Sequence, residues 1–292
     1  MAERDLTFAN FNLFNNVYDI GDGVLHEMAN VTGHELAPAP DVDNLGGLIS
    51  AIGPAKELQA NISHVQEILG TDQDAIEIAR DWVTRTGLLT PVERFFPSNP
   101  YKAGDCELGI AVVTGGVRNW MARRAIRLAQ LSGGADPLET TFLVAGNRVM
   151  KPAEGADVRE GMTEADYMEA VIQPQLSNIG LDSEVIRVDS GVGDDVMRAA
   201  AVAVSGRYDL HDPSKGVFLV SNAGAWVQNS GQFRRALRQI TPNFDARSSQ
   251  LAVASDSFKL GETGAEPTST HQNPFTALGQ IARNAQELAR HQ

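Results

Sequence analysis

The sequence predicts an α/β protein: a Rossmann-like three-layer sandwich with a mostly parallel sheet of about five strands, preceded by a helical N-terminal region. Short apolar runs alternate with amphipathic segments after residue 100. Each run is continuously apolar, which is typical of a parallel strand covered on both faces. Clusters of Gly, Asn, Asp and Ser follow the runs, as turns do. The five predicted strands are residues 108–113, 141–145, 185–188, 217–220 and 251–254.

Residues 1–100 form the predicted helical N-terminal region. Segments 44–69 and 71–85 have helical spacing of apolar residues, and the prolines in segment 95–100 interrupt any helix. Residues 101–292 form the predicted Rossmann-like domain, which closes with a C-terminal helix over about residues 274–290.

Three amphipathic segments between the strands each carry one apolar stripe at helical spacing. Pro174 lies inside the second of these helices and is expected to kink it or mark its early end. The stripes are Met121, Ala125 and Leu128, then Met168, Ile172, Leu176 and Ile179, then Phe233, Leu237 and Ile240.

Charge and hydropathy argue against a nucleic-acid or membrane partner. Lys and Arg total 24 against 37 Asp and Glu, so the net charge of -13 disfavours nucleic acid and membrane surfaces. No apolar run approaches the roughly 18 residues of a membrane-spanning helix. The first residues include acids and lead into no apolar signal region, so we expect a cytoplasmic location.

The first predicted strand runs into a glycine pair that favours an anion-binding turn. Thr114, Gly115 and Gly116 precede Arg118, where the next helix is expected to begin. Paired glycines let backbone amides approach a phosphate or carboxylate closely. A simple tight turn explains the same residues equally well, and the motif is neither a Walker loop nor a complete dinucleotide fingerprint.

The second strand ends in Gly146, Asn147 and Arg148. The guanidinium group offers a bidentate fork to an anion, and Arg118 is expected at the same edge of the sheet. Taken singly, each arginine also fits a solvated loop. Their shared position at strand ends favours anion binding.

Acidic residues follow the third strand at Asp189, Asp194 and Asp195. Beside glycines, such acids bind ribose hydroxyls, hold a magnesium ion through water, or act as a general base. Asp194 or Asp195 serves equally well as the N-cap of a helix expected to begin near Val196.

Polar residues after the fourth strand complete the predicted site. Ser221 and Asn222 end that strand, and Gln232 lies in the following helix. Residues 151–163 form a long polar connection that we interpret as a lid, leading into Glu164. The six histidines lack metal-ligand spacing, so we expect no metal site.

A series of landmarks runs through the predicted sheet domain. They are Gly115–Gly116, residues 164–170, Leu176, Gly180, Glu184, residues 188–191 and 195–199, and finally residues 218–237. Their order resembles a family of unknown biochemical function that includes the ElyC, SanA and YdcF proteins. The resemblance implies a Rossmann-like fold, and it permits S-adenosylmethionine as a ligand.

Three functions remain open from the sequence. The first is a cytoplasmic small-molecule-binding protein whose ligand is nucleotide-like or S-adenosylmethionine-like. The second is a hydrolase or transferase acting on a phosphorylated or nucleoside substrate, with Asp189, Asp194 or Glu164 as acid or base. The third is an interaction scaffold that docks a partner protein through its helical N-terminal region.

Overall fold

The chain divides into two compact units, Met1–Thr90 with Phe258–Gln292, and Pro91–Ser257. The structure is a computed structural model that describes residues 29–30, 58–69, 74, 77, 81, 107–132, 138–212, 215–222, 225–242, 244, 251–255 and 283–284. In the first unit, helix α4 spans Leu58–Leu69 and buries Val65. Residues 74, 77 and 81 of the predicted segment 71–85 are helical, and most of the remaining predicted N-terminal and C-terminal helices lie outside the described residues.

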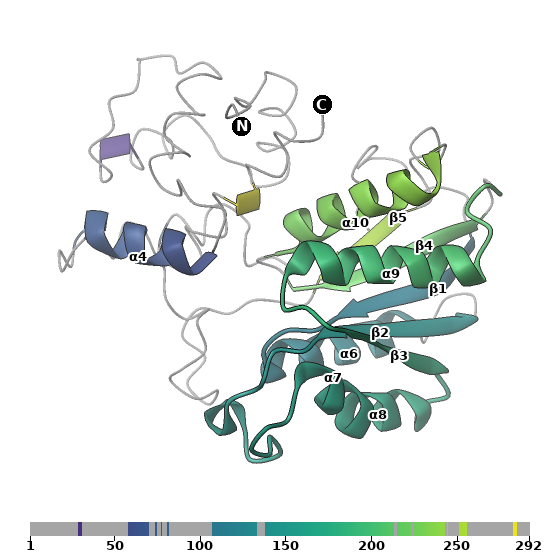
Figure 1. Ribbon diagram of the computed structural model, residues 1–292, viewed down its shortest axis with the longest axis horizontal. Helices are drawn as coiled ribbons and strands as arrows, with labels where there is room; N and C mark the ends of the chain where they lie inside the picture. Colours follow the sequence, from purple (N-terminus) through teal and green to yellow (C-terminus); the bar gives the residue numbers. More distant parts are fainter. Residues whose placement is uncertain are drawn as a thin grey trace. The chain divides into compact units, whose positions relative to one another are not determined.

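The second unit contains an all-parallel sheet of five strands in the order β3-β2-β1-β4-β5 (Figure 1). Each strand includes one of the five predicted apolar runs, so the predicted α/β fold class is confirmed. The strands are β1 (Glu107–Thr114), β2 (Thr140–Gly146), β3 (Ser183–Val188), β4 (Lys215–Ser221) and β5 (Leu251–Ser255).

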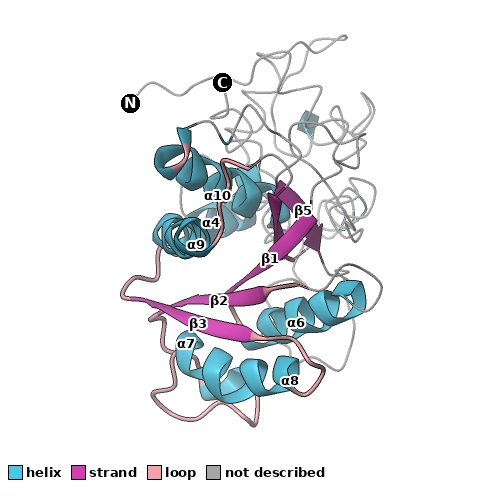
Figure 2. Ribbon diagram, turned by 90° about the vertical axis from the view of Figure 1, so that its right-hand side faces the viewer, coloured by secondary structure: helices cyan, strands magenta, loops and turns pink. Residues whose placement is uncertain are grey.

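Helices cover both faces of the sheet, which makes the sandwich Rossmann-like (Figure 2). One face carries α6 (Arg118–Ser132), α7 (Glu164–Tyr167), the π-helical η2 (Met168–Ile172) and α8 (Gln173–Ser177). The other carries α9 (Gly193–Arg207) and α10 (Trp226–Ile240). The chain builds the sheet in one direction from β1 to β3, and then returns to place β4 on the other side of β1. The strand order therefore reverses between β1 and β4.

Most of the predicted apolar stripes lie in the core. Met121, Leu128 and Phe233 are fully buried, for example. Two predictions were wrong at helix ends, because Ile179 is 55% exposed and Ile240 is 39% exposed. Ile179 follows the end of α8 in a turn completed by Gly180 at φ +81, and Ile240 is the last residue of α10.

The helix around Pro174 widens instead of ending at the proline. Proline has no N–H to donate, and its ring collides with the carbonyl group four residues earlier in a regular helix. The chain adopts a π-helical turn at this point, where the N–H of Gln173 donates to the oxygen of Met168. Pro174 then occupies the first turn of α8, and the helix continues to Ser177.

Candidate ligand-binding edge

The carboxyl ends of the parallel strands meet at one edge of the sheet. Gly146 at the end of β2 packs so closely on the turn after β3 that a Cβ atom there would collide with the Ser190 backbone oxygen. The turn after β1 joins β2 through the Gly115 N–H, which donates to the oxygen of Val144 at 2.7 Å. The loops predicted to converge therefore do converge, and exposed Asn147 lies at the same edge.

A buried arginine of α6 joins the ends of β1 and β4. Arg124 is 2% exposed, and its Nη1 donates to the Thr114 carbonyl at 2.6 Å, the Thr114 hydroxyl at 2.7 Å and the Gly115 carbonyl at 2.6 Å. Its Nη2 donates to Asn222 Oδ1 at 3.4 Å. The guanidinium group thus lies at the point where the strand order reverses.

The sequence reasoning missed Arg124, although the sequence contained a signal for it. Arg124 follows Met121 by three residues and precedes Leu128 by four, which places it on the predicted buried stripe. An arginine on the buried face of a helix needs acceptors close by.

Arg118 and Arg148, the two arginines predicted to bind an anion, instead bind carboxylates of this chain. Arg118 Nε and Nη2 donate to Asp157 at 2.5 and 3.0 Å. Arg148 Nη1 and Nη2 donate to Glu154 at 2.7 and 3.2 Å, and Arg148 Nε donates to Glu164 Oε1 at 2.5 Å. Two of these acids belong to the segment 151–163.

Glu154 also occupies the N-terminus of α6. Its Oε2 accepts from the Arg118 N–H at 3.1 Å, and its Oε1 accepts from the Lys151 N–H at 3.0 Å. Burial raises the pKa of Glu154, but the hydrogen bonds from Arg148 and from these two amides outweigh it, so the pKa is below its usual value. An internal carboxylate thus takes the position that the sequence suggested for an exogenous anion.

The segment 151–163, interpreted as a lid, is closed at its base. The Met150 N–H donates to the Met162 oxygen at 2.8 Å, and Val149 forms an isolated bridge with Thr163. Through Glu154 and Asp157 the segment contacts the start of α6. It therefore lies against the β1–α6 turn.

Glu164 is a buried carboxylate beside the glycine turn. A Cβ atom on Gly115 would lie 2.6 Å from Glu164 Oε2 and 3.0 Å from the Ala145 Cα, so a larger residue there would require both to shift. Burial raises the pKa of Glu164, against the opposing influence of Arg148 and Arg124. Its position in the first turn of α7 follows from Thr163, whose hydroxyl accepts from the Asp166 N–H as an N-cap.

The acids after β3 are exposed, and the prediction that Asp194 or Asp195 is an N-cap was wrong. Helix α9 begins at Gly193 after the N-cap Val192, so both acids lie in its first turn. The Ser190 hydroxyl accepts from the Val192 N–H at 3.1 Å, which helps to start the helix earlier than expected. Asp195 accepts from the Ser190 hydroxyl, Asp194 accepts from Arg235, and Asp189 follows β3.

Two buried amide side chains at this edge have atoms without hydrogen-bond partners. Asn222 is 1% exposed and Gln232 is 7% exposed, and the unpaired atoms are Asn222 Nδ2 and Gln232 Oε1. A Cβ atom on Gly193 would lie 3.5 Å from Gln232 Oε1, so this amide lies against the start of α9. The neighbouring Ser221 hydroxyl accepts from Asn229 Nδ2 at 2.9 Å.

The described residues contain no cluster of three or more His, Cys, Asp or Glu side chains suited to a metal ion. Within the same part of the chain, no helix has the length and apolar character needed to cross a membrane. Comparisons with protein-family models, with curated proteins and with solved structures found no match to this chain.

Proposed function

We propose that the protein binds a small, nucleotide-like molecule at the carboxyl edge of its sheet, between the ends of β1 and β4. In open parallel sheets, ligands bind outside the strand ends where the strand order reverses. The observation that carries the proposal is the pair of unpaired buried amide atoms, Asn222 Nδ2 and Gln232 Oε1. A buried polar group without a partner costs about 1–3 kcal/mol, and a ligand would remove that cost.

The two atoms define what the ligand must offer. Asn222 Nδ2 donates, and therefore needs an oxygen or a ring nitrogen; Gln232 Oε1 accepts, and therefore needs a hydroxyl or amino group. The positive end of the α9 dipole starts beside Gln232 at the exposed Gly193 and favours a negatively charged group. Nucleoside phosphates and S-adenosylmethionine both combine these three features.

Arg118 and Arg148 support the site indirectly in this proposal. Each guanidinium group already binds carboxylates of the chain, so neither is assigned the anionic group of the ligand. They hold the segment 151–163 against the turn that follows β1. The cytoplasmic location and the absence of a nucleic-acid partner stay predictions from composition.

A specific observation favours a second candidate, an enzyme that acts on a phosphorylated or nucleoside substrate. Glu164 combines burial, a raised pKa and a position beside the Gly115 turn. Such a carboxylate is suited to general acid or base catalysis. This function is tested by incubating the protein with each nucleotide that it binds and measuring product. Product formation that Glu164→Gln abolishes would establish an enzyme.

The binding proposal is tested by thermal unfolding with nucleoside phosphates and S-adenosylmethionine, followed by calorimetric titration of each stabilising compound. A ligand at a hundred times its Kd stabilises the folded chain by about 2.7 kcal/mol. We expect Gln232→Met to weaken binding about tenfold, which is about 1.4 kcal/mol. Without ligand, this variant should be as stable as the original chain, because its unpaired oxygen is gone.

The matched control is Gln175→Met, which changes an exposed glutamine on α8. It should bind the same ligand with unchanged affinity. If none of these compounds stabilises the chain, or if Gln232→Met and Gln175→Met bind equally well, the proposed site is wrong.

A further inference from the structure

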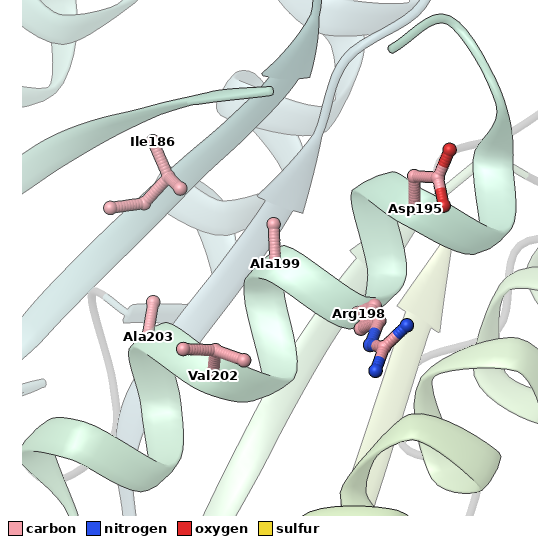
Figure 3. A pocket seen from close by; sticks show the side chains of 6 residues that line it. All are labelled: Ile186, Asp195, Arg198, Ala199, Val202 and Ala203. Carbon is pink, nitrogen blue, oxygen red and sulfur yellow. The ribbon is translucent and has the colours of Figure 1, made fainter. Parts of the chain in front are cut away.

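A groove lies between the edge strand β3 and helix α9, separate from the amide pair (Figure 3). Its volume is about 530 Å³. Ile186 extends into it from β3, opposite small apolar side chains of α9. The lining residues are Ile186, Asp195, Arg198, Ala199, Val202 and Ala203.

Helix α9 packs over β2 and β3, and the groove lies along the side of the helix that faces β3. The sheet-facing stripe of α9 is buried and includes Met197, Ala201 and Val204. The groove residues occupy the neighbouring flank of the helix, where Val202 is 57% exposed. Among the described residues, β3 pairs only with β2, so no strand lies along its other edge.

The open edge of β3 offers backbone groups to an additional strand. The Thr141 N–H donates to the Asp182 oxygen, and successive residues of a strand direct their backbone polar groups to alternate sides. Ser183, Val185 and Arg187 therefore direct theirs away from β2. Gln173 Nε2 donates to the Ser183 oxygen at 2.6 Å, which leaves the stretch from Val185 to Arg187 as the open edge.

Arg198 supplies a positive charge beside the apolar residues that line the groove. Two other arginines of these elements bind carboxylates. Arg187 of β3 binds Asp166, and Arg207 at the end of α9 binds Glu184. Among the described contacts, Arg198 has no hydrogen bond or ion pair. Of the residues that line the groove, it is therefore the cation that remains available to a partner's carboxylate.

We propose that an extended peptide segment of a partner protein binds here as an additional strand beside β3. Its backbone pairs with Val185 and Arg187, an apolar side chain fills the groove against Ile186 and Val202, and an Asp or Glu side chain binds Arg198. When a peptide adds a strand to a sheet edge, backbone hydrogen bonds provide the affinity and alternate side chains of the peptide provide the specificity. A second copy of this chain is a poorer occupant because each copy carries a net charge of -13.

The proposal is tested by selecting random peptides displayed on phage against the full chain. We expect enriched peptides to alternate apolar and polar residues and to share an acidic residue. Val202→Asp should reduce their binding at least tenfold, since it introduces a charge among the apolar residues that line the groove. Ile126→Asp is the matched control, because Ile126 is 56% exposed on α6 and lies outside the groove.

Two further measurements separate this binding mode from others. Selection against Arg198→Glu should replace the shared acid by Lys or Arg, and bound peptide should protect the Val185 and Arg187 amides from hydrogen exchange. The proposal is overturned if no peptide prefers the original chain to Val202→Asp, or if bound peptides leave both amides unprotected. It is also overturned if the chain self-associates and Val202→Asp dissociates it, because a second copy would then fill the groove.

Discussion

Arg124 shows how a single side chain organises the candidate site. Its Nη1 donates to Thr114 and Gly115, and its Nη2 donates to Asn222, the residue that follows β4. The side chain also lies over the Trp120 ring, with 5.7 Å between the guanidinium carbon and the ring centroid. The amide end of Asn222 is thereby oriented, with Oδ1 toward Arg124.

We expect Arg124→Met to destabilise the fold by about 2–5 kcal/mol, because it leaves buried acceptors on Thr114 and Gly115 without a donor. Urea unfolding followed by circular dichroism measures the change. Arg159→Met, at an exposed arginine, should stay within about 0.5 kcal/mol of the original chain. Equal stability of the two variants would contradict a structural role for Arg124.

Gly146→Ala tests whether the turns after β2 and β3 pack as closely as the structure indicates. The added methyl group would collide with the Ser190 oxygen, a backbone atom, so the turn must move. We expect a loss of about 1–3 kcal/mol in thermal or urea unfolding. The control is Gly206→Ala in α9, where the new methyl group has nothing within 4 Å and should stabilise the helix by about 0.5–1 kcal/mol. A neutral Gly146→Ala would show that the two turns are further apart.

At the scale of elements, the start of α7 depends on a reciprocal cap. Asp166 Oδ2 accepts from the Thr163 N–H at 2.9 Å and from the Thr163 hydroxyl at 2.7 Å. Arg187 of β3 donates to Asp166 Oδ1 at 2.7 Å. The cap therefore links the start of the helix to the edge strand. It also places Glu164 in the first turn, beside Gly115.

This cap predicts a pH dependence. The Thr163 backbone hydrogen bond, followed by Arg187 and the Thr163 hydroxyl, lowers the pKa of Asp166 to about 2. An unperturbed aspartate has a pKa of about 3.9, so the unfolded chain binds the proton more tightly. The contribution of Asp166 to stability is present above about pH 4 and is lost as the pH falls toward 2.

Thermal unfolding as a function of pH should show a smaller loss of stability below pH of about 4 for Asp166→Asn than for the original chain. The expected difference is modest because Asp166 is 40% exposed and solvent screens its interactions. Identical acid profiles would show that the cap does not contribute to stability.

At the scale of the whole molecule, the strand order decides where a ligand can bind. The β3-β2-β1-β4-β5 order sends α6 and α10 to opposite faces after β1 and β4. The connections that follow β1 and β4 therefore lead away from each other, and Asn222 directly follows β4 at the place where they separate. The partner-binding proposal concerns another part of the sheet, the β3 edge, and can fail independently.

The division into two units predicts that residues 91–257 fold on their own. This unit contains the five strands of the described sheet and the helices that cover them. We expect the expressed segment to give a cooperative thermal transition followed by circular dichroism. A broad, non-cooperative loss of signal would show that residues 258–292 or 1–90 are needed for the fold.

The sequence by itself determined the sheet strands, the alternation of strands and helices, and the set of loops at the carboxyl edge. These follow from apolar runs and glycine-rich turns, which are local properties of the chain. Tertiary structure alone decided the partners of the charged groups. Arg118 and Arg148 were predicted to take an anion but bind Asp157, Glu154 and Glu164, because the segment 151–163 folds back onto α6. Pairings between side chains far apart in sequence depend on how loops pack, and residue spacing does not encode that packing.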